Sequence, residues 1–277
     1  MKSFYIITNS TRDKDLEVTS RVESFFKEAG VRYFTHVADV NRADTYTDEN
    51  DIPKDTDCVI VLGGDGTMIQ AAHDTADLDL PLLGINLGRI GYLADVEVGD
   101  IIPSLTALID DRYIIEERMM ISGEIITKGC ENHDKNRALN DIVIHRGGEM
   151  RVVNYKVYIN DKFLYDFRAD GMIVSTPTGS TAYSMSAGGP IVEPMSEMII
   201  ITPICPHTVN SRSIVFSSKD RIRISAEKYN VYANFDGRVS LPLTPKEEIL
   251  IMRSSKTTKL VRLKDDSFLT VLHDKFI

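Results

Sequence analysis

Five consecutive residues, Gly63-Gly64-Asp65-Gly66-Thr67, place a single carboxylate among three glycines. Glycines let the backbone approach phosphate groups closely, and the N-terminus of a helix favours negative charge. A carboxylate at such a place repels phosphate unless it binds a metal ion, accepts a hydrogen bond from a substrate hydroxyl or takes that hydroxyl's proton. We therefore expect a phosphate site in which Asp65 is catalytic and in which Gly64 and Gly66 contact the phosphates.

The alternative interpretation is a tight strand-to-helix turn in which Asp65 only caps the helix. Three glycines around one aspartate exceed what a cap requires. Two common phosphate-binding patterns do not fit, because the chain contains no G-x-x-x-x-G-K-[ST] and no G-x-G-x-x-G follows a strand here. The segment therefore predicts neither a Walker A loop nor a Rossmann fingerprint.

A second segment, Asp170 to Ser184, is rich in hydroxyl-bearing and small residues, contains one aromatic residue, Tyr183, and continues into Ala187-Gly188-Gly189-Pro190. On a strand, a turn and a helix, such residues form a surface that hydrogen-bonds a ribose and admits a flat base against the tyrosine ring. A Ser/Thr-rich loop that only caps a helix is the alternative.

Strand and helix signals alternate around the first segment. The expected strands are Phe4–Ile7, Val31–Val37, Cys58–Leu62 and Leu82–Asn86, and the expected helices are Val18–Ala29, Thr67–Ala76 and Ile101–Asp110. An acidic, polar stretch from Asp39 to Asp57 is typical of an exposed connection. This alternation predicts an α/β domain built from βαβ units, over residues 1–115.

The rest of the chain offers mostly strand-length runs separated by turn residues. The expected strands are Met119–Thr127, Ile142–His145, Val152–Ile159, Met172–Ser175, Ile199–Thr202, Ile222–Ser225, Val231–Phe235, Thr257–Leu263 and Ser267–Leu272, with one short helix at Ser180–Ala187. Residues 116–255 are therefore expected to form a mainly β domain, and 256–277 a C-terminal segment. A junction between two domains is a common place for a ligand site.

Composition limits the partners. A formal charge of -9 and a pI near 5.2 argue against broad binding to nucleic acid or to an anionic membrane. Cys58, Cys130 and Cys205 are widely spaced and include no C-x-x-C pair, so they predict neither a disulfide framework nor a zinc site. The apolar run Phe4–Ile7 is too short for a signal sequence or a membrane span. We expect a cytoplasmic protein.

At its two segments the sequence resembles known kinases. The Gly63 to Thr67 motif is shared by NAD kinases, by diacylglycerol and sphingosine-type lipid kinases and, more loosely, by phosphofructokinases, so it selects phosphoryl transfer but not the acceptor. The stretch from Asp170 to Pro190 is similar to the signature of NAD kinases over some twenty positions. This resemblance implies an NAD kinase-like two-domain fold, in which the C-terminal segment packs back on the N-terminal domain.

The resemblance also implies roles for single residues. Asn140 and Asp141 resemble the family's Asn-Glu pair, with aspartate where glutamate is more common, and are expected to hydrogen-bond the nicotinamide-side ribose or amide. Asp170 with Arg168 is expected to shape the nucleotide site. The adenine and ribose pockets are expected to be lined by Thr181, Ala182, Tyr183, Ser184, Met185 and Ser186. Asn86, Arg151 and Asp236 are expected around the same site.

The implied activity is phosphorylation of the 2′-hydroxyl of the adenosine ribose of NAD, which gives NADP. Asp65 would orient that hydroxyl and accept its proton. Mg²⁺ or another divalent cation brought with ATP would offset phosphate charge, and no metal site of the protein's own is expected. The donor stays open between ATP, another triphosphate and polyphosphate. The resemblance also implies a homodimer or homotetramer.

Two other functions fit part of the sequence. A lipid kinase would share Gly63 to Thr67 but would need an apolar entry for an acyl chain. A non-catalytic NADP-binding sensor would keep the ribose pocket and show no turnover.

Overall fold

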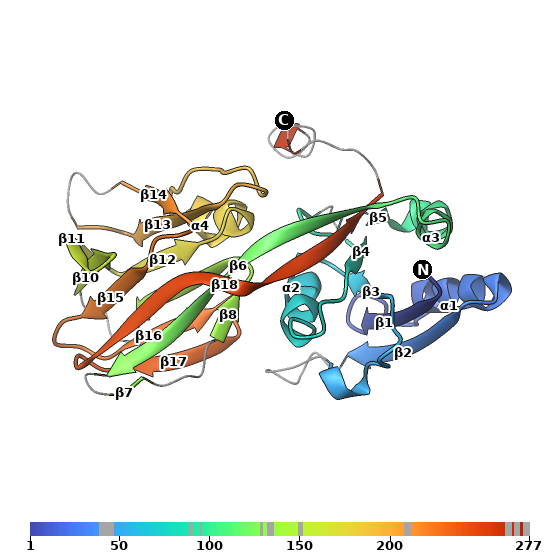
Figure 1. Cartoon of the computed structure of the whole chain (residues 1–277), viewed down its shortest axis with the longest axis horizontal. Helices are drawn as coiled ribbons and strands as arrows, with labels where there is room; N and C mark the ends of the chain where they lie inside the picture. The colour runs from blue at the N-terminus through green and yellow to red at the C-terminus, as the bar shows by residue number, and fades with distance from the viewer. Residues whose placement is uncertain are drawn as a thin grey trace. The chain divides into compact units, whose positions relative to one another are not determined.

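The computed structural model describes residues 1–38, 47–88, 91–94, 96–127, 130–131, 136–148, 152–207, 212–263, 268 and 272–273. The chain forms two compact units, one of Met1–Glu117 with Lys256–Ile277 and one of Arg118–Ser255 (Figure 1). The division falls inside two long strands, β6 (Ile114–Thr127) and β18 (Glu247–Arg262).

The first unit is an α/β sheet. Its elements are β1 (Ser3–Asn9), α1 (Glu17–Ala29), β2 (Arg32–Ala38), a 3₁₀ turn at Glu49–Asp51, β3 (Cys58–Gly63), α2 (Asp65–Asp74), β4 (Leu82–Asn86), β5 (Val96–Glu97), a 3₁₀ turn at Val98–Asp100 and α3 (Ile101–Ile109). The strands pair in parallel in the order β2-β1-β3-β4, as expected for βαβ units. Leu260 of β18 pairs with Leu82 of β4.

Apolar strand residues and amphipathic helices explain this arrangement. All seven residues of β1 and all six of β3 are buried, as in a parallel sheet covered on both faces. Helix α1 buries Val22 and Phe26 in the core, and the Phe26 ring stacks on Phe4 with centroids 4.5 Å apart. The helix ends at Gly30, whose φ of 69° is a left-handed C-cap that suits glycine.

The second unit contains two antiparallel sheets. Its elements are β7 (Cys130–Glu131), β8 (Asn136–Ala138), β9 (Asp141–Arg146), β10 (Val153–Ile159), β11 (Lys162–Ala169), β12 (Gly171–Ser175), a 3₁₀ turn at Thr178–Thr181, α4 (Tyr183–Ser186), β13 (Met198–Ile204), β14 (Ile214–Ser217), β15 (Ile222–Ala226), β16 (Val231–Phe235) and β17 (Val239–Leu243). One sheet contains β11-β10-β15-β18 and the other β14-β13-β12-β9-β16-β17. Buried side chains from both sheets form one apolar cluster.

The fold class expected from the sequence is confirmed: an α/β unit and a mainly β unit. Two local predictions are wrong. The helix expected at Ser180–Ala187 is broken at Ala182, whose backbone angles are not helical, into a 3₁₀ turn and the short α4. Phe268 and Leu272, expected in a strand, have helical backbone, which suits apolar residues four apart; the other residues of Ser267–Leu272 lie outside the described chain.

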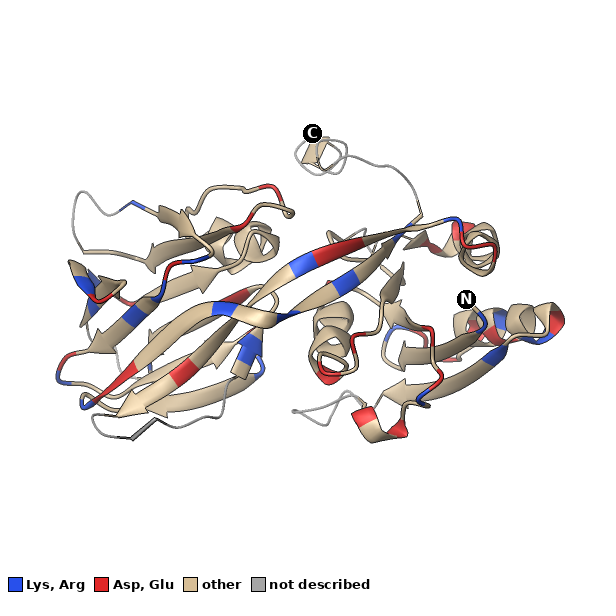
Figure 2. Cartoon of the chain, in the orientation of Figure 1, with Lys and Arg blue, Asp and Glu red and all other residues tan. Residues whose placement is uncertain are grey.

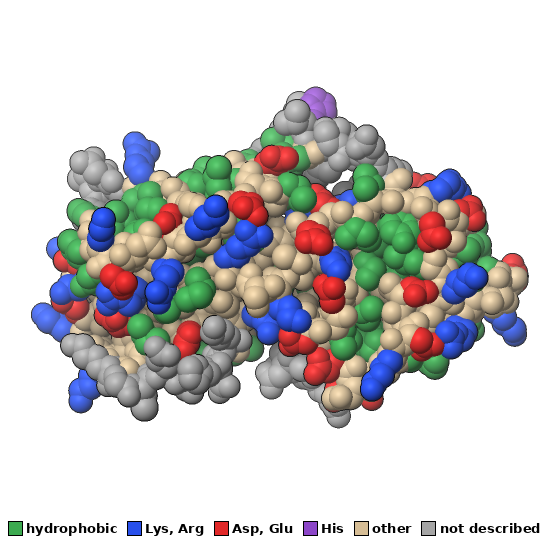
Figure 3. All heavy atoms as spheres, in the orientation of Figure 1, with side chains coloured by type: hydrophobic (Ala, Val, Ile, Leu, Met, Phe, Trp, Pro, Cys, Tyr) green, Lys and Arg blue, Asp and Glu red, His purple; other side chains and the backbone are tan. Residues whose placement is uncertain are grey.

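Charges are mixed over the molecule. Basic and acidic residues are interspersed along the elements of each unit (Figure 2) and over the face of the chain seen in Figure 3. In the part of the chain that the structure describes, no helix is long and apolar enough to cross a membrane.

A chain that ends at Ser255 loses the β18 residues that complete the first unit. Leu260 and Val261 are each 1% exposed, and removing such side chains costs roughly 2–5 kcal/mol each. We expect the truncated chain to be insoluble or to melt at a markedly lower temperature. Full solubility with the melting temperature of the parent would show that this strand is dispensable.

Candidate active site

The glycine-rich turn lies at the carboxyl edge of the first unit's sheet. Strand β3 ends at Gly63 and α2 begins at Asp65, while β1 ends at Asn9 and β4 at Asn86. The carboxyl edge of a parallel sheet is where such folds bind ligands. Asn9 donates from Nδ2 to Thr67 Oγ1 at 3.1 Å, and Asn86 Oδ1 accepts the Gly88 N–H at 2.9 Å. These bonds fix the two turns beside Asp65.

The Asp65 carboxylate accepts three backbone N–H groups from one turn. Tyr92 donates to Oδ2 at 2.8 Å, and Leu93 and Ala94 donate to Oδ1 at 3.0 and 3.2 Å. A Cβ at Gly91 would lie 1.8 Å from Oδ1, so the close approach requires glycine there. Among the described residues, the hydrogen bonds to the Asp65 side chain come from this turn and not from α2, so Asp65 does not cap its own helix.

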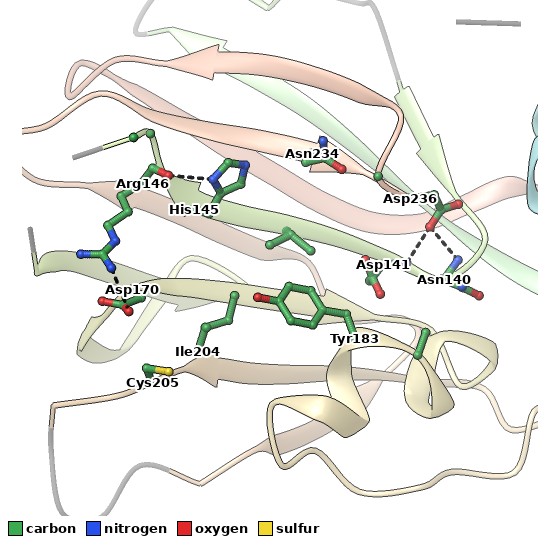
Figure 4. A pocket seen from close by; sticks show the side chains of 15 residues that line it. Asn140, Asp141, His145, Arg146, Asp170, Tyr183, Ile204, Cys205, Asn234 and Asp236 are labelled. Carbon is green, nitrogen blue, oxygen red and sulfur yellow. Dashed lines mark hydrogen bonds and ion pairs between the residues drawn. The ribbon is translucent and has the colours of Figure 1, made fainter. Parts of the chain in front are cut away.

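A pocket of about 850 Å³ lies within the second unit (Figure 4). Six of the residues expected from the sequence line it: Asn140, Asp141, Asp170, Ala182, Tyr183 and Asp236. The Tyr183 side chain, 46% exposed, extends from α4 into the pocket, with its hydroxyl on the side of Ile204 (Figure 4). An aromatic ring, carboxylates and an amide thus converge on one cavity, which is the composition of a small-molecule site.

Asp236 holds the turn before β9 in the same way that Asp65 holds its own. Its Oδ2 accepts the Leu139 N–H at 2.7 Å, and its Oδ1 accepts those of Asn140 and Asp141 at 2.9 and 2.8 Å (Figure 4). The φ of Asp236 is 50°, a left-handed conformation that aspartate tolerates better than most residues.

The turn that carries Asn140 contacts the segment from Asp170 to Ser184 at the Asn140 carbonyl. Thr176 donates from its backbone N–H to that carbonyl at 2.9 Å and from Oγ1 to the Leu139 carbonyl at 2.6 Å. A Cβ at Gly179 would lie 2.1 Å from the Asn140 oxygen. Gly179 is therefore needed for the close packing of the turn that carries Asn140.

Asp141 is a buried carboxyl, with 6% of the residue exposed. Burial, with a smaller contribution from the negative charge of Asp236, raises the pKa of Asp141 from its usual value of 3.8 to about 7. Near neutral pH the pocket therefore contains a carboxyl that is partly protonated and can donate a hydrogen bond as well as accept one.

The opposite end of the pocket contains an ion pair that sequence reasoning missed. Arg146 contacts Asp170 at 3.0 Å, and His207 Nε2 lies 3.9 Å from the same carboxylate. Gly237, which the family resemblance also implied beside Asp236, lines the pocket, and the lining residues that were not expected are Val143, His145, Gly147, Gly148, Ile204, Cys205 and Asn234. Alternation along a strand is the signal that finds some of them, since Asp141, Val143 and His145 lie two residues apart and face the same side.

Of the expected residues of the second unit that the structure describes, five do not line this cavity. Ser184 is fully buried and its Oγ lies 3.1 Å from Thr202 Oγ1, and Thr181 Oγ1 donates to the Thr178 carbonyl at 3.3 Å. Met185 and Ser186 lie on α4 beside Tyr183. Arg168 is exposed on β11, and Arg151 lies outside the described residues. Gly64, Gly66 and Asn86 belong to the first unit with Asp65.

No group of three or more His, Cys, Asp or Glu side chains within the described ranges is arranged to hold a metal ion.

Comparisons with known proteins identify the family. The ATP-NAD kinase N-terminal domain matches residues 4–113 and the ATP-NAD kinase C-terminal domain matches residues 139–263. NAD kinases of Lachnoclostridium phytofermentans and of Caldanaerobacter subterraneus subsp. tengcongensis are 42% and 40% identical, over 100% and 99% of this chain and 99% of each relative.

Solved structures agree. The chain resembles yeast NADH kinase complexed with NADH, with a TM-score of 0.84 and 25% identity, over 99% of this chain and 87% of that one. It also resembles an NAD kinase from Archaeoglobus fulgidus in complex with ATP, with a TM-score of 0.79 and 25% identity, over 99% and 98%. The chain is a phosphotransferase. It belongs to the NAD kinase family.

Asp141 makes stability depend on pH. The folded chain binds more protons than the unfolded chain between pH 3.8 and about 7, so the stability given by the neutral carboxyl is present below this range and is lost as the pH rises through 7. From pH 5 to pH 7 we expect the free energy of unfolding to fall by ~2 kcal/mol relative to Asp141→Asn, which does not titrate. Denaturant titrations at both pH values measure this difference, and equal changes in the two proteins would contradict the assignment.

Proposed function

We propose that this chain transfers the γ-phosphoryl group of a nucleoside triphosphate to the 2′-hydroxyl of the adenosine ribose of NAD, which gives NADP. The proposal rests on the hydrogen bonds that the Asp65 carboxylate accepts. A carboxylate has about four lone-pair positions, and backbone N–H groups take three of them. The position left on Oδ2 is available to a substrate hydroxyl.

Relatives support this choice of reaction. NAD kinases match the whole chain at 38–42% identity. The two similar solved structures are described with NADH and with ATP respectively, which are an acceptor and a donor of the proposed reaction class. The relatives and structures named above are NAD or NADH kinases, and none of them is named as a lipid kinase or as a sensor.

Asp65 is assigned the chemical step. It would orient the 2′-hydroxyl and accept its proton as the oxygen attacks the γ-phosphorus and the bond from that phosphorus to the bridging oxygen of the nucleoside diphosphate breaks. Backbone N–H groups at Gly64 and Gly66 would face the phosphates, near the N-terminus of α2. The divalent cation would enter as part of the triphosphate substrate and offset its charge.

The pocket of the second unit is assigned recognition of NAD. Tyr183 would stack on the adenine, and Asn140 and Asp141 would hydrogen-bond the nicotinamide-side ribose or amide. The Arg146–Asp170 pair would close the far end, with Arg168 near it on β11. Asp65 and this pocket belong to different units, so the proposal assigns chemistry to one and recognition to the other.

A panel of donors and acceptors tests the proposal. ATP, other triphosphates and polyphosphate are combined with NAD, NADH or diacylglycerol, and NADP(H) is detected as product. We expect NADP from NAD with at least one triphosphate and no phosphorylated lipid. NAD binding by calorimetry without turnover under any donor would instead indicate a sensor.

We further propose a cytoplasmic homodimer or homotetramer, as expected from the family resemblance. Light scattering of the purified chain measures the assembly, and a mass equal to one chain, 31.1 kDa, would refute it.

Tyr183→Ala tests the assignment of the pocket to NAD. Losing an aromatic stacking contact typically costs about 0.5–1.5 kcal/mol, so Tyr183→Ala is expected to weaken NAD binding roughly three- to twelve-fold while the melting temperature stays unchanged. Tyr183→Phe, which keeps the ring, is the matched control and is expected to bind nearly as the parent does. An unchanged dissociation constant of Tyr183→Ala for NAD would show that Tyr183 does not contribute to NAD binding.

Asp65→Asn tests the role of Asp65 in the chemical step. Asp65→Asn keeps the size of the side chain but cannot take a proton, and general-base assistance is worth about 10²–10⁴-fold. We expect kcat to fall by that order while KM for NAD changes much less. The variant's melting temperature is measured on the same preparation. A kcat within a few-fold of the parent would show that Asp65 is not the base.

A further inference from the structure

The turn that binds Asp65 has a second set of contacts, through its carbonyl groups. Arg262, near the end of β18, donates from Nη1 to the Leu93 carbonyl and from Nη2 to the Tyr92 carbonyl, each at 3.4 Å. The planar guanidinium can address two acceptors at once because its donors form a rigid fork. One side chain thus holds two consecutive peptide groups.

These are the same peptide groups that bind Asp65. The Tyr92 carbonyl shares its peptide plane with the Leu93 N–H, and the Leu93 carbonyl shares its plane with the Ala94 N–H. Both N–H groups donate to Asp65 Oδ1. Each peptide plane is therefore held by a cation at its oxygen and by an anion at its nitrogen, and such chained hydrogen bonds polarise one another.

Arg262 is itself fixed by an acidic partner on β6. Its Nε donates to Glu116 Oε2 at 2.7 Å, and the two side chains are 15% and 22% exposed. A partly buried ion pair with this geometry orients the guanidinium toward the turn. Glu116, Arg262, the turn and Asp65 all belong to the first unit.

We propose that Arg262 is a positioning residue for phosphoryl transfer: by holding the Tyr92–Ala94 peptides it fixes the orientation of the Asp65 carboxylate toward the substrate hydroxyl. The proposal rests on the role proposed for Asp65 above. Loss of this orientation lowers the rate of the chemical step, because small displacements of a catalytic group are costly, while NAD binding in the other unit is retained.

Arg262→Lys is the main test. Lysine keeps the charge and can still pair with Glu116, but a single ammonium group does not reproduce the fork. Arg253→Ala is the matched control, since Arg253 also lies on β18 and pairs with an acidic residue, Glu197 at 2.6 Å, without touching the turn. We expect kcat to fall about ten-fold in Arg262→Lys with KM for NAD within two-fold, and Arg253→Ala to behave as the parent.

A double variant separates positioning from general stabilisation. If Arg262 acts through Asp65, then Asp65→Asn with Arg262→Lys has the same kcat as Asp65→Asn alone. A further ten-fold loss in the double variant, or an unchanged kcat in Arg262→Lys, would overturn the proposal.

Hydrogen exchange separates a failure of this positioning role from a failure of the proposed function. In Arg262→Lys the amides of Leu93 and Ala94 are expected to exchange faster than in the parent and in Arg253→Ala. This measurement needs no turnover, so it holds even if the parent does not phosphorylate NAD. Unchanged exchange at both amides would refute the positioning role by itself.

Discussion

Hydrogen bonds from backbone N–H groups to an aspartate carboxylate are the interaction that organises the Asp65 region of the first unit and the pocket of the second. Asp65 takes three N–H groups from the Tyr92–Ala94 turn, and Asp236 takes three from the Leu139–Asp141 turn. Burying a turn costs free energy when its backbone N–H groups have no hydrogen-bond acceptor. A carboxylate satisfies several of these donors at once, and its charge strengthens each bond.

The glycines around the site follow from these carboxylates and turns. Gly91 admits Asp65, and Gly179 admits the Asn140 carbonyl, at distances where a Cβ would overlap other atoms. Each turn then holds neighbouring groups in a fixed place: the Asp65 Oδ2 position that no backbone N–H occupies in one unit, and Asn140 and Asp141 in the pocket of the other. Rigid turns of this kind supply preorganised groups, which is how a fold supports phosphoryl transfer with few catalytic side chains.

The sequence predicted what is local. The apolar run at Cys58–Leu62, the glycines after it and the hydroxyl-rich stretch after Asp170 carry their own signals, and the structure has β3, α2 and β12 at these places. Periodicity also separated the α/β half from the β half. The break at Ala182 was not predictable. The residues on either side of it keep a helical spacing in the sequence, but the backbone angles of Ala182 itself are not helical.

What the sequence did not predict is long-range pairing. Asp236 is 97 residues from Leu139, and Arg262 is 169 residues from Leu93, so no spacing in the sequence indicates that they bind one another. Arg146 was missed for the same reason, since its partner Asp170 lies in the bend between β11 and β12. Family resemblance placed Asp236 near the substrate, but only the structure shows it holding the turn of Asn140.

A crystal structure of the chain with NAD bound tests the role of Asp65 most directly. We predict the adenosine 2′-hydroxyl at about 3 Å from Asp65 Oδ2, with the three N–H bonds to the carboxylate retained and the adenine against Tyr183. An NAD molecule whose 2′-hydroxyl contacts neither oxygen of Asp65, while the Tyr92–Ala94 turn still binds that carboxylate, would contradict this role of Asp65.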